Sequence, residues 1–228
     1  MGQDGRPEAT APEFSGGPSG LCQGQACSLI VEADHRIANH LALLATHLRL
    51  QAREFARQTE PMTREAASLL FAHLDGQISA VARLHRRLSG AEARACVDLA
   101  SELHAICAPF QAGLSGGVVI VEDLDDDCTV TSRQLLPLAQ IITEVITNAL
   151  KHAFPNGRGM LLVRQRRRDG GSAQIEIQDH GRGFPPAFDP LTGGGLGFRV
   201  VRALAAQLRA DIAFESSSAG VRFRIALP

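Results

Sequence analysis

Apolar residues recur every seven positions through the first part of the chain, and this spacing limits what that part can form. One stretch carries the sets Ile30, Ile37, Leu44 and Leu41, Leu48, Phe55, and a later one carries Ala67, Leu74, Val81, Leu88 and Leu70, Leu84. Such spacing is typical of helices that pack along one another. Thr59-Glu60-Pro61 separates the two stretches, and Thr63 is placed to cap the second helix. We therefore predict two long helices folded into an antiparallel hairpin.

A hairpin of two helices buries its apolar seam poorly on its own. A second copy of the chain would complete a four-helix bundle, so we expect a homodimer formed through residues 28–90. Gln51 and Gln77 interrupt the seams, and buried amides of that kind fix the register between helices.

The character of the chain changes after Gly90. Helical patterns are expected near 96–112, 132–154 and 195–208, and strands near 117–124, 159–168, 172–179, 211–215 and 221–227. Strands that arrive in adjacent pairs, with helices between the groups, predict an α/β sandwich with a mixed, mostly antiparallel sheet. The expected organisation is a disordered tail at 1–26, a helical hairpin at 27–90 and an α/β domain at 91–228.

The charge balance and the cysteines exclude several classes of partner. The 23 basic and 24 acidic side chains give a net charge of −1, so no global field attracts nucleic acid or an anionic membrane. The basic run Arg164–Arg168 is better explained as a solvated strand end than as a binding patch. The sequence has no run of about 18 apolar residues, no apolar signal segment and, among its five cysteines, no CxxC pair. We expect a cytoplasmic protein with reduced thiols that binds neither nucleic acid nor membrane.

A polar stripe marks the stretch EVITNALKHAFPNG at residues 144–157. Glu144, Asn148, Lys151 and His152 fall at i, i+4, i+7 and i+8, so they share one face of an otherwise apolar helix. On this helix alone, the simpler interpretation is a solvent-exposed face with a salt bridge between Glu144 and Lys151. The alternative is a ligand site.

Two glycine-rich stretches follow that helix. IEIQDHGRGFP, residues 175–185, is an alternating strand that ends in Asp179, Gly181 and Gly183, where the backbone can approach a ligand closely. GGGLGFRVVRALAAQL, residues 193–208, places four glycines at the start of an amphipathic helix, whose free N–H groups attract phosphate. Neither stretch matches the dinucleotide fingerprint or a Walker A loop, and each alone could be an ordinary turn.

The order of these three stretches is more specific than any one of them. E-x-x-x-N-A-x-K-H, then D-x-G-x-G, then G-x-G-L-G before a helix closely resembles the N, G1 and G2 boxes of the Bergerat-type ATPase fold of gyrase, the Hsp90 chaperones, MutL and the histidine kinases. LPLAQIITEVITNALKHAF and the closing AGVRFRIALP look most like the histidine kinase branch.

The front hairpin carries a second resemblance. EADHRIANHLALL, residues 32–44, is similar to the phosphoacceptor box E-x-x-H-R-[IV]-x-N of HisKA_2-like histidine kinases. The matching positions are Glu32, His35, Arg36, Ile37 and Asn39. His35 follows the seam position Asp34, which places it on the flank of the bundle. Together, the two resemblances cover roughly residues 28–228 of the chain.

The resemblance implies a set of roles in binding ATP with Mg²⁺. Asn148 would coordinate Mg²⁺, Glu144 would hold or polarise the reacting groups, and Asp179 would accept a hydrogen bond from the adenine amino group. The remaining implied ATP-binding residues are Lys151, His152, Gly181, Gly183, Gly193, Gly195, Leu196 and Gly197. Residues 184–192 would form a short lid.

The implied reaction moves the γ-phosphoryl group of ATP to an imidazole nitrogen of His35, and from there to an aspartate of a response-regulator receiver domain. Asn39 stands where related kinases place a group for dephosphorylating the regulator. A separate sensor protein is a possible source of input. Three departures from the pattern concern ATP binding: His180 replaces a common Asn, Arg182 between the glycines is unusual, and Val221 replaces a common Thr.

Two other functions share this fold. A dimeric histidine phosphotransferase would relay phosphoryl groups between receiver domains without using ATP, but intact Asn148, Asp179 and glycines argue against it. An anti-sigma-factor serine kinase would need neither the His35 box nor the long hairpin. The main prediction is therefore an ATP-dependent protein-histidine kinase.

Overall fold

The computed structural model describes scattered positions between residues 38 and 56, and residues 61–88, 96–114, 117–168 and 171–228. His35, Asn39 and the tail at 1–26 lie outside these residues, as does most of the first predicted helix. None of the helices in the described parts of the chain is both long and apolar enough to span a membrane.

A five-stranded sheet forms one layer of the structure, in the order β2-β4-β5-β7-β6. The strands are β2 Gly117–Leu124, β4 Arg158–Arg167, β5 Ala173–Asp179, β6 Asp211–Ser217 and β7 Gly220–Ala226. The pair β2–β4 is parallel, and the other three pairs are antiparallel. The predicted mixed, mostly antiparallel sheet is confirmed.

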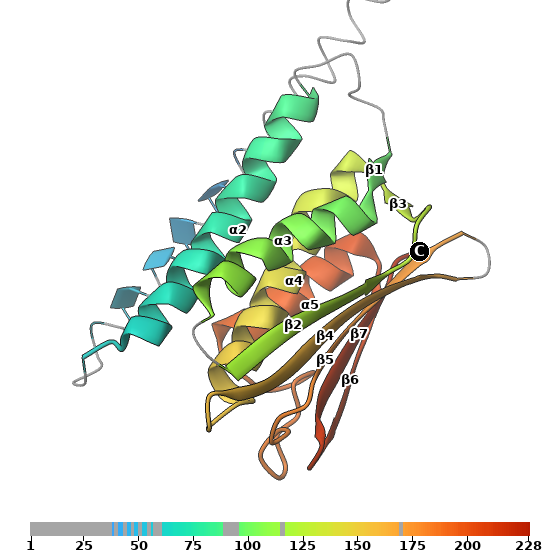
Figure 1. The fold of residues 1–228 in the computed structure, drawn as a ribbon. Coiled ribbons are helices and arrows are strands. Elements are labelled where there is room, and N and C mark those ends of the chain that lie inside the picture. The colour runs from blue at the N-terminus through green and yellow to red at the C-terminus, as the bar shows by residue number, and fades with distance from the viewer. Residues whose placement is uncertain are drawn as a thin grey trace, which may run out of the picture.

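Three helices cover one face of this sheet: α3 Leu99–Gly113, α4 Ser132–His152 and α5 Leu196–Leu208. The helix α2, Arg64–Leu88, packs on α3 and α4 on their side away from the sheet (Figure 1). Every second residue of β5 is buried beneath the helices, as expected for a sheet covered on one face. The largest fully buried side chains include Phe110, Ile141, Ile142, Ile146, Leu161, Ile175 and Phe223.

Polar caps fix where these helices begin. The Thr63 hydroxyl accepts a hydrogen bond from Ala66 N–H at 3.1 Å, which confirms it as the cap of α2. Asp98 caps α3 by accepting from Ser101 N–H at 2.9 Å, so α3 begins three residues later than predicted. The preceding residues belong instead to β1, Val97–Asp98, which pairs with β3, Thr129–Val130.

Arg164 and Arg166, from the basic run predicted as a solvated strand end, lie on β4, on the face opposite the buried Gln165. Arg164 contacts Asp123 Oδ2 at 3.0 Å and Glu176 Oε1 at 2.9 Å, on the two neighbouring strands. Arg166 pairs with Asp123 and Asp125. Because carboxylates of the same sheet neutralise these arginines, the structure supports a solvated strand over a binding patch.

Candidate functional site

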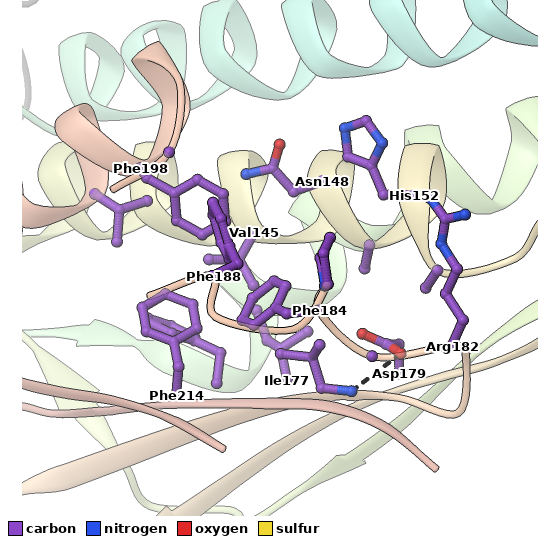
Figure 2. A pocket seen from close by; sticks show the side chains of 18 of the residues that line it. Val145, Asn148, His152, Ile177, Asp179, Arg182, Phe184, Phe188, Phe198 and Phe214 are labelled. Carbon is purple, nitrogen blue, oxygen red and sulfur yellow. Dashed lines mark hydrogen bonds between the residues drawn. The ribbon is translucent and has the colours of Figure 1, made fainter. Parts of the chain in front are cut away.

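A cavity of about 290 Å³ opens between α4, the loop after β5 and the start of α5. Asn148 and His152 of α4 line it, together with Asp179, Gly183 and Gly195. The structure therefore brings residues from all three motif stretches around one cavity. Figure 2 shows Asp179 and Arg182 at one end, and the rings of Phe188, Phe198 and Phe214 at the other.

Among the predicted ATP-binding and catalytic residues that the structure describes, six do not line this cavity. They are Glu144, Lys151, Gly181, Gly193, Leu196 and Gly197. Two of them, Gly181 and Gly197, pack closely against α4 and the residue after it, and Glu144 faces His73 of α2.

Asp179 is held at the end of β5 with only 4% of its surface exposed. Its Oδ1 accepts hydrogen bonds from Gly181 N–H at 2.9 Å and Val221 N–H at 3.2 Å. Burial raises the pKa of this carboxyl, and the two backbone hydrogen bonds oppose that rise. Val221 donates this hydrogen bond from its backbone N–H. The bond therefore does not depend on whether the side chain at position 221 is Val or the more common Thr.

Close backbone packing explains two of the glycines in the loop after β5. Gly183 has φ of 71°, and a Cβ at this position would collide with the carbonyl oxygen of Ser217. A Cβ at Gly181 would collide with the carbonyl of Ala153, just past the end of α4. These glycines hold the loop against α4 and the sheet, which closes one side of the cavity.

The glycine-rich start of α5 lies directly against α4. A Cβ added at Gly197 would lie 2.8 Å from Glu144 Oε2 and 3.4 Å from Asn148 Nδ2. The segment before it is tied down by Arg202, whose Nη1 donates to the carbonyls of Pro190 at 2.7 Å and Gly193 at 2.8 Å. The N-terminus of α5 therefore faces the cavity beside Asn148, where its free N–H groups can meet an anion.

Five phenylalanines pack into one cluster that forms the apolar wall of the cavity. They are Phe184, Phe188, Phe198, Phe214 and Phe223. Ring centroids lie between 4.9 Å, for Phe214–Phe223, and 6.1 Å, for Phe184–Phe214, which is the usual range for aromatic contacts. Five of the chain's ten phenylalanines meet here, and no spacing in the sequence predicts this cluster. The rings are tilted against one another by 49–71° and give the cavity an apolar side.

Glu144 does not belong to a solvent-exposed stripe. It is 3% exposed, and its Oε1 lies 3.5 Å from Nε2 of His73 on α2. Burial raises the pKa of Glu144 to about 7, while the nearby Lys151 lowers it. The solvent-face interpretation of the stripe therefore fails at Glu144 and holds for the exposed Lys151, whereas His152 is exposed at the edge of the cavity that it lines.

The C-terminal end of α4 places positive charge near the mouth of the cavity. The pKa of His152 is lowered by burial and then by the charges of Lys151 and Arg182. Lys151 and Arg182 therefore carry the positive charge of this region, which would attract an anionic ligand, and the largely neutral His152 lies near them.

The fold and the site define the class of ATPase to which this region belongs. Residues 134–228 match the family of histidine kinase-, DNA gyrase B- and HSP90-like ATPases. Residues 32–112 match HisKA_2, a histidine kinase family. The chain belongs to the histidine kinases that join a HisKA_2 region to this ATPase domain.

Comparisons with individual proteins agree with this family. The chain is 27% identical to blue-light-activated histidine kinase 2 of Erythrobacter litoralis over 205 residues, which cover 87% of this chain and 56% of the relative. It is 27% identical to the sensor histidine kinase PdtaS of Mycobacterium tuberculosis over 77% of this chain and 34% of that protein. The structure is similar to the histidine kinase domain of the Erythrobacter litoralis EL346 blue-light-activated kinase, with a TM-score of 0.66 and 25% identity over 90% of this chain and 94% of that one. The chain thus spans between a third and just over half of these curated relatives.

Proposed function

We propose that this chain is an ATP-dependent protein-histidine kinase of a two-component system. It would transfer the γ-phosphoryl group of ATP to His35 and then to an aspartate of a response-regulator receiver domain. The observation that carries this proposal is the single cavity where Asn148, Asp179 and the glycine-rich start of α5 converge. The HisKA_2 match, which includes His35, supports the choice of acceptor.

The residues around the cavity fit a nucleotide. Asp179 would accept a hydrogen bond from the adenine amino group at its end of the cavity. The phosphates would then extend towards the N-terminus of α5, between Asn148 and the cations at the end of α4. Gly193, Gly195, Leu196 and Gly197 would form the phosphate end of the lid over residues 184–192.

Mg²⁺ fits the same region, because an amide oxygen is a suitable hard ligand for it. Asn148 is the residue that would hold the ion, next to the start of α5. When bound, Mg²⁺ would neutralise part of the phosphate charge. Lys151 would do the same from the side of the cavity mouth, and His152, whose pKa is lowered, would contribute a ring N–H as a hydrogen-bond donor.

In the proposed reaction, a neutral imidazole nitrogen of His35 attacks the γ-phosphorus. A nitrogen–phosphorus bond forms, the bond to the bridging oxygen breaks, and ADP leaves. The receiver aspartate later takes the phosphoryl group from the imidazole. Asn39, four residues after His35 in the sequence, would assist dephosphorylation of the regulator.

A homodimer through residues 28–90 fits what the structure shows of α2. Phe71 and Ile78 lie seven residues apart and are 69% and 55% exposed. Two large apolar side chains on one exposed helix face are suited to packing against another helix. A separate protein or domain would supply the sensory input.

The test is incubation of the purified chain with γ-labelled ATP and Mg²⁺, beside His35→Ala, Asn148→Ala and Asp179→Asn variants. We expect acid-labile, base-stable label on the wild type and none on His35→Ala, with little on the other two. An unlabelled wild type whose His35 still accepts phosphoryl from a phosphorylated receiver domain would instead identify a phosphotransferase that does not use ATP. His85→Ala, on the exposed side of α2, is the matched control and should label like the wild type.

A further inference from the structure

Arg182 stands between Gly181 and Gly183 in the loop after β5, and its side chain lines the cavity. Figure 2 shows it at the same end of the cavity as Asp179, with its guanidinium group extending towards His152 of α4. This is the end where the base of a nucleotide would lie. An arginine at this place therefore needs a role that the phosphates alone do not supply.

The backbone on both sides of Arg182 is fixed by close packing. Its own N–H donates to the carbonyl of Ala153, just past the end of α4, at 3.1 Å. A Cβ at Gly181 would collide with that same carbonyl, and a Cβ at Gly183 would collide with the carbonyl of Ser217. The loop is thus clamped between α4 and the sheet, and it presents the Arg182 side chain at a defined place on the cavity wall.

The guanidinium group of Arg182 has no partner among the residues that the structure describes. None of their carboxylates or carbonyls forms an ion pair or a hydrogen bond with it. Asp179, at the same end of the cavity, accepts hydrogen bonds from two backbone N–H groups and makes no ion pair with Arg182. An acceptor and a set of donors therefore line one end of the cavity without pairing with each other.

This arrangement is complementary to the amino edge of adenine. An ionised carboxyl only accepts hydrogen bonds, and a guanidinium group only donates them. The amino group of adenine is a donor that stands between two ring nitrogens, N1 and N7, and both of these are acceptors. A donor beside the Asp179 carboxyl can therefore meet a ring nitrogen whichever way the ring faces.

A contact with the phosphates is the other role open to an arginine here. The proposed phosphate site is at the start of α5, where Gly197 lies against Asn148. His152 is four residues further along α4 than Asn148, and Arg182 lies beside His152 (Figure 2). Because Arg182 is displaced from the start of α5 towards Asp179, the geometry favours the base over the phosphates.

We propose that Arg182 is a specificity-determining residue for the base, whose guanidinium group donates a hydrogen bond to a ring nitrogen of adenine beside the amino group that Asp179 binds. This inference rests on the proposed use of ATP. It gives a role to an arginine that departs from the usual pattern of this loop. No covalent bond changes, and the contact acts on the affinity for the nucleotide.

ATP analogues that lack one ring nitrogen test this contact. 1-Deaza-ATP and 7-deaza-ATP carry a carbon atom in place of N1 or N7, and they keep the amino group and the triphosphate. Isothermal titration calorimetry of the full chain with Mg²⁺ measures Kd for ATP and for each analogue. We expect one of the two analogues to bind the wild type about three- to tenfold more weakly than ATP, which corresponds to one hydrogen bond.

Arg182→Met removes the donors and keeps a long side chain. We expect this variant to bind ATP about three- to tenfold more weakly than the wild type. It should also lose the difference between ATP and the weaker analogue, because the variant and the analogue remove the same contact from its two sides. Arg199→Met, at an exposed position of α5 outside the cavity, is the matched control and should bind all three nucleotides like the wild type.

Three results would overturn the inference. One is equal affinity of the wild type for ATP and both analogues, and another is an unchanged Kd for ATP in Arg182→Met. The third is an equal loss of affinity for all three nucleotides in that variant, which would assign Arg182 to the phosphates. Because the titrations need no phosphoryl transfer, a wild type that shows the expected Kd pattern but takes no label would refute the proposed kinase function alone. A wild type that binds none of the three nucleotides would refute both.

Discussion

Replacing Glu144 with glutamine should change how the stability of this fold depends on pH. Burial raises the pKa of Glu144 from 4.5 to about 7. Between those values the folded chain keeps a proton that the unfolded chain has lost, so the free energy of unfolding falls as pH rises. This loss of stability is absent at pH values below the pKa of the unfolded chain, and it is complete above the pKa of the folded chain.

The size of the effect follows from the two pKa values. At about 1.4 kcal/mol per pKa unit, full ionisation of Glu144 would cost on the order of 3 kcal/mol. Between pH 5.5 and pH 8, the free energy of unfolding of the wild type should fall by about 2 kcal/mol through this group alone. Glutamine has nearly the same shape and does not ionise, so Glu144→Gln should lose this part of the pH dependence.

Urea unfolding followed by circular dichroism, at several pH values across that interval, measures the difference. We expect Glu144→Gln to be more stable than the wild type at pH 8, with the advantage shrinking towards pH 5.5. Glu65→Gln, an exposed acid on α2, is the control and should follow the wild type. Parallel curves for the wild type and Glu144→Gln would show that the carboxyl is not held protonated by burial.

Three further substitutions test the cavity. Asp179→Asn should weaken binding of a fluorescent ATP analogue by about 10- to 100-fold, because a charge-assisted hydrogen bond contributes roughly 1.5–3 kcal/mol; an unchanged Kd would contradict its role at the base. Gly183→Ala should destabilise the fold by about 1–3 kcal/mol, since φ is 71° there. Thermal unfolding measures this effect, and Gly195→Ala is the control because a Cβ there meets nothing within 4 Å. Arg202→Met should free the carbonyls of Pro190 and Gly193 and speed proteolysis of the lid, and unchanged cleavage would show that Arg202 does not restrain it.

The sequence predicts most of this fold because its elements are long and regular. The helix expected at 132–154 is α4, Ser132–His152, and the strand expected at 117–124 has those bounds. The ladder of β1 and β3 has only two residues in each strand, so it leaves no periodic pattern to detect. Short ladders of this kind depend on which segments the tertiary fold brings together.

The sequence likewise predicts one part of the candidate site and not another. Motif order predicts that Asn148, Asp179 and the glycines before α5 meet, and the cavity contains residues from all three stretches. Helical spacing also predicts that Glu144 shares the face of Asn148, but it does not reveal which neighbour covers each turn. Glu144 lies one turn before Asn148 and is covered by α2. No local sequence pattern predicts that contact. The phenylalanine wall was missed for a similar reason, since its members are spread from Phe184 to Phe223.

The two turns of α4 around Glu144 and Asn148 lie in different surroundings. Asn148 lines the cavity, whereas Glu144 is covered by α2. A mutation of the cavity, such as Asp179→Asn, should therefore raise KM for ATP more than it lowers kcat, because Asp179 faces the proposed nucleotide site, and steady-state kinetics measures the two effects separately.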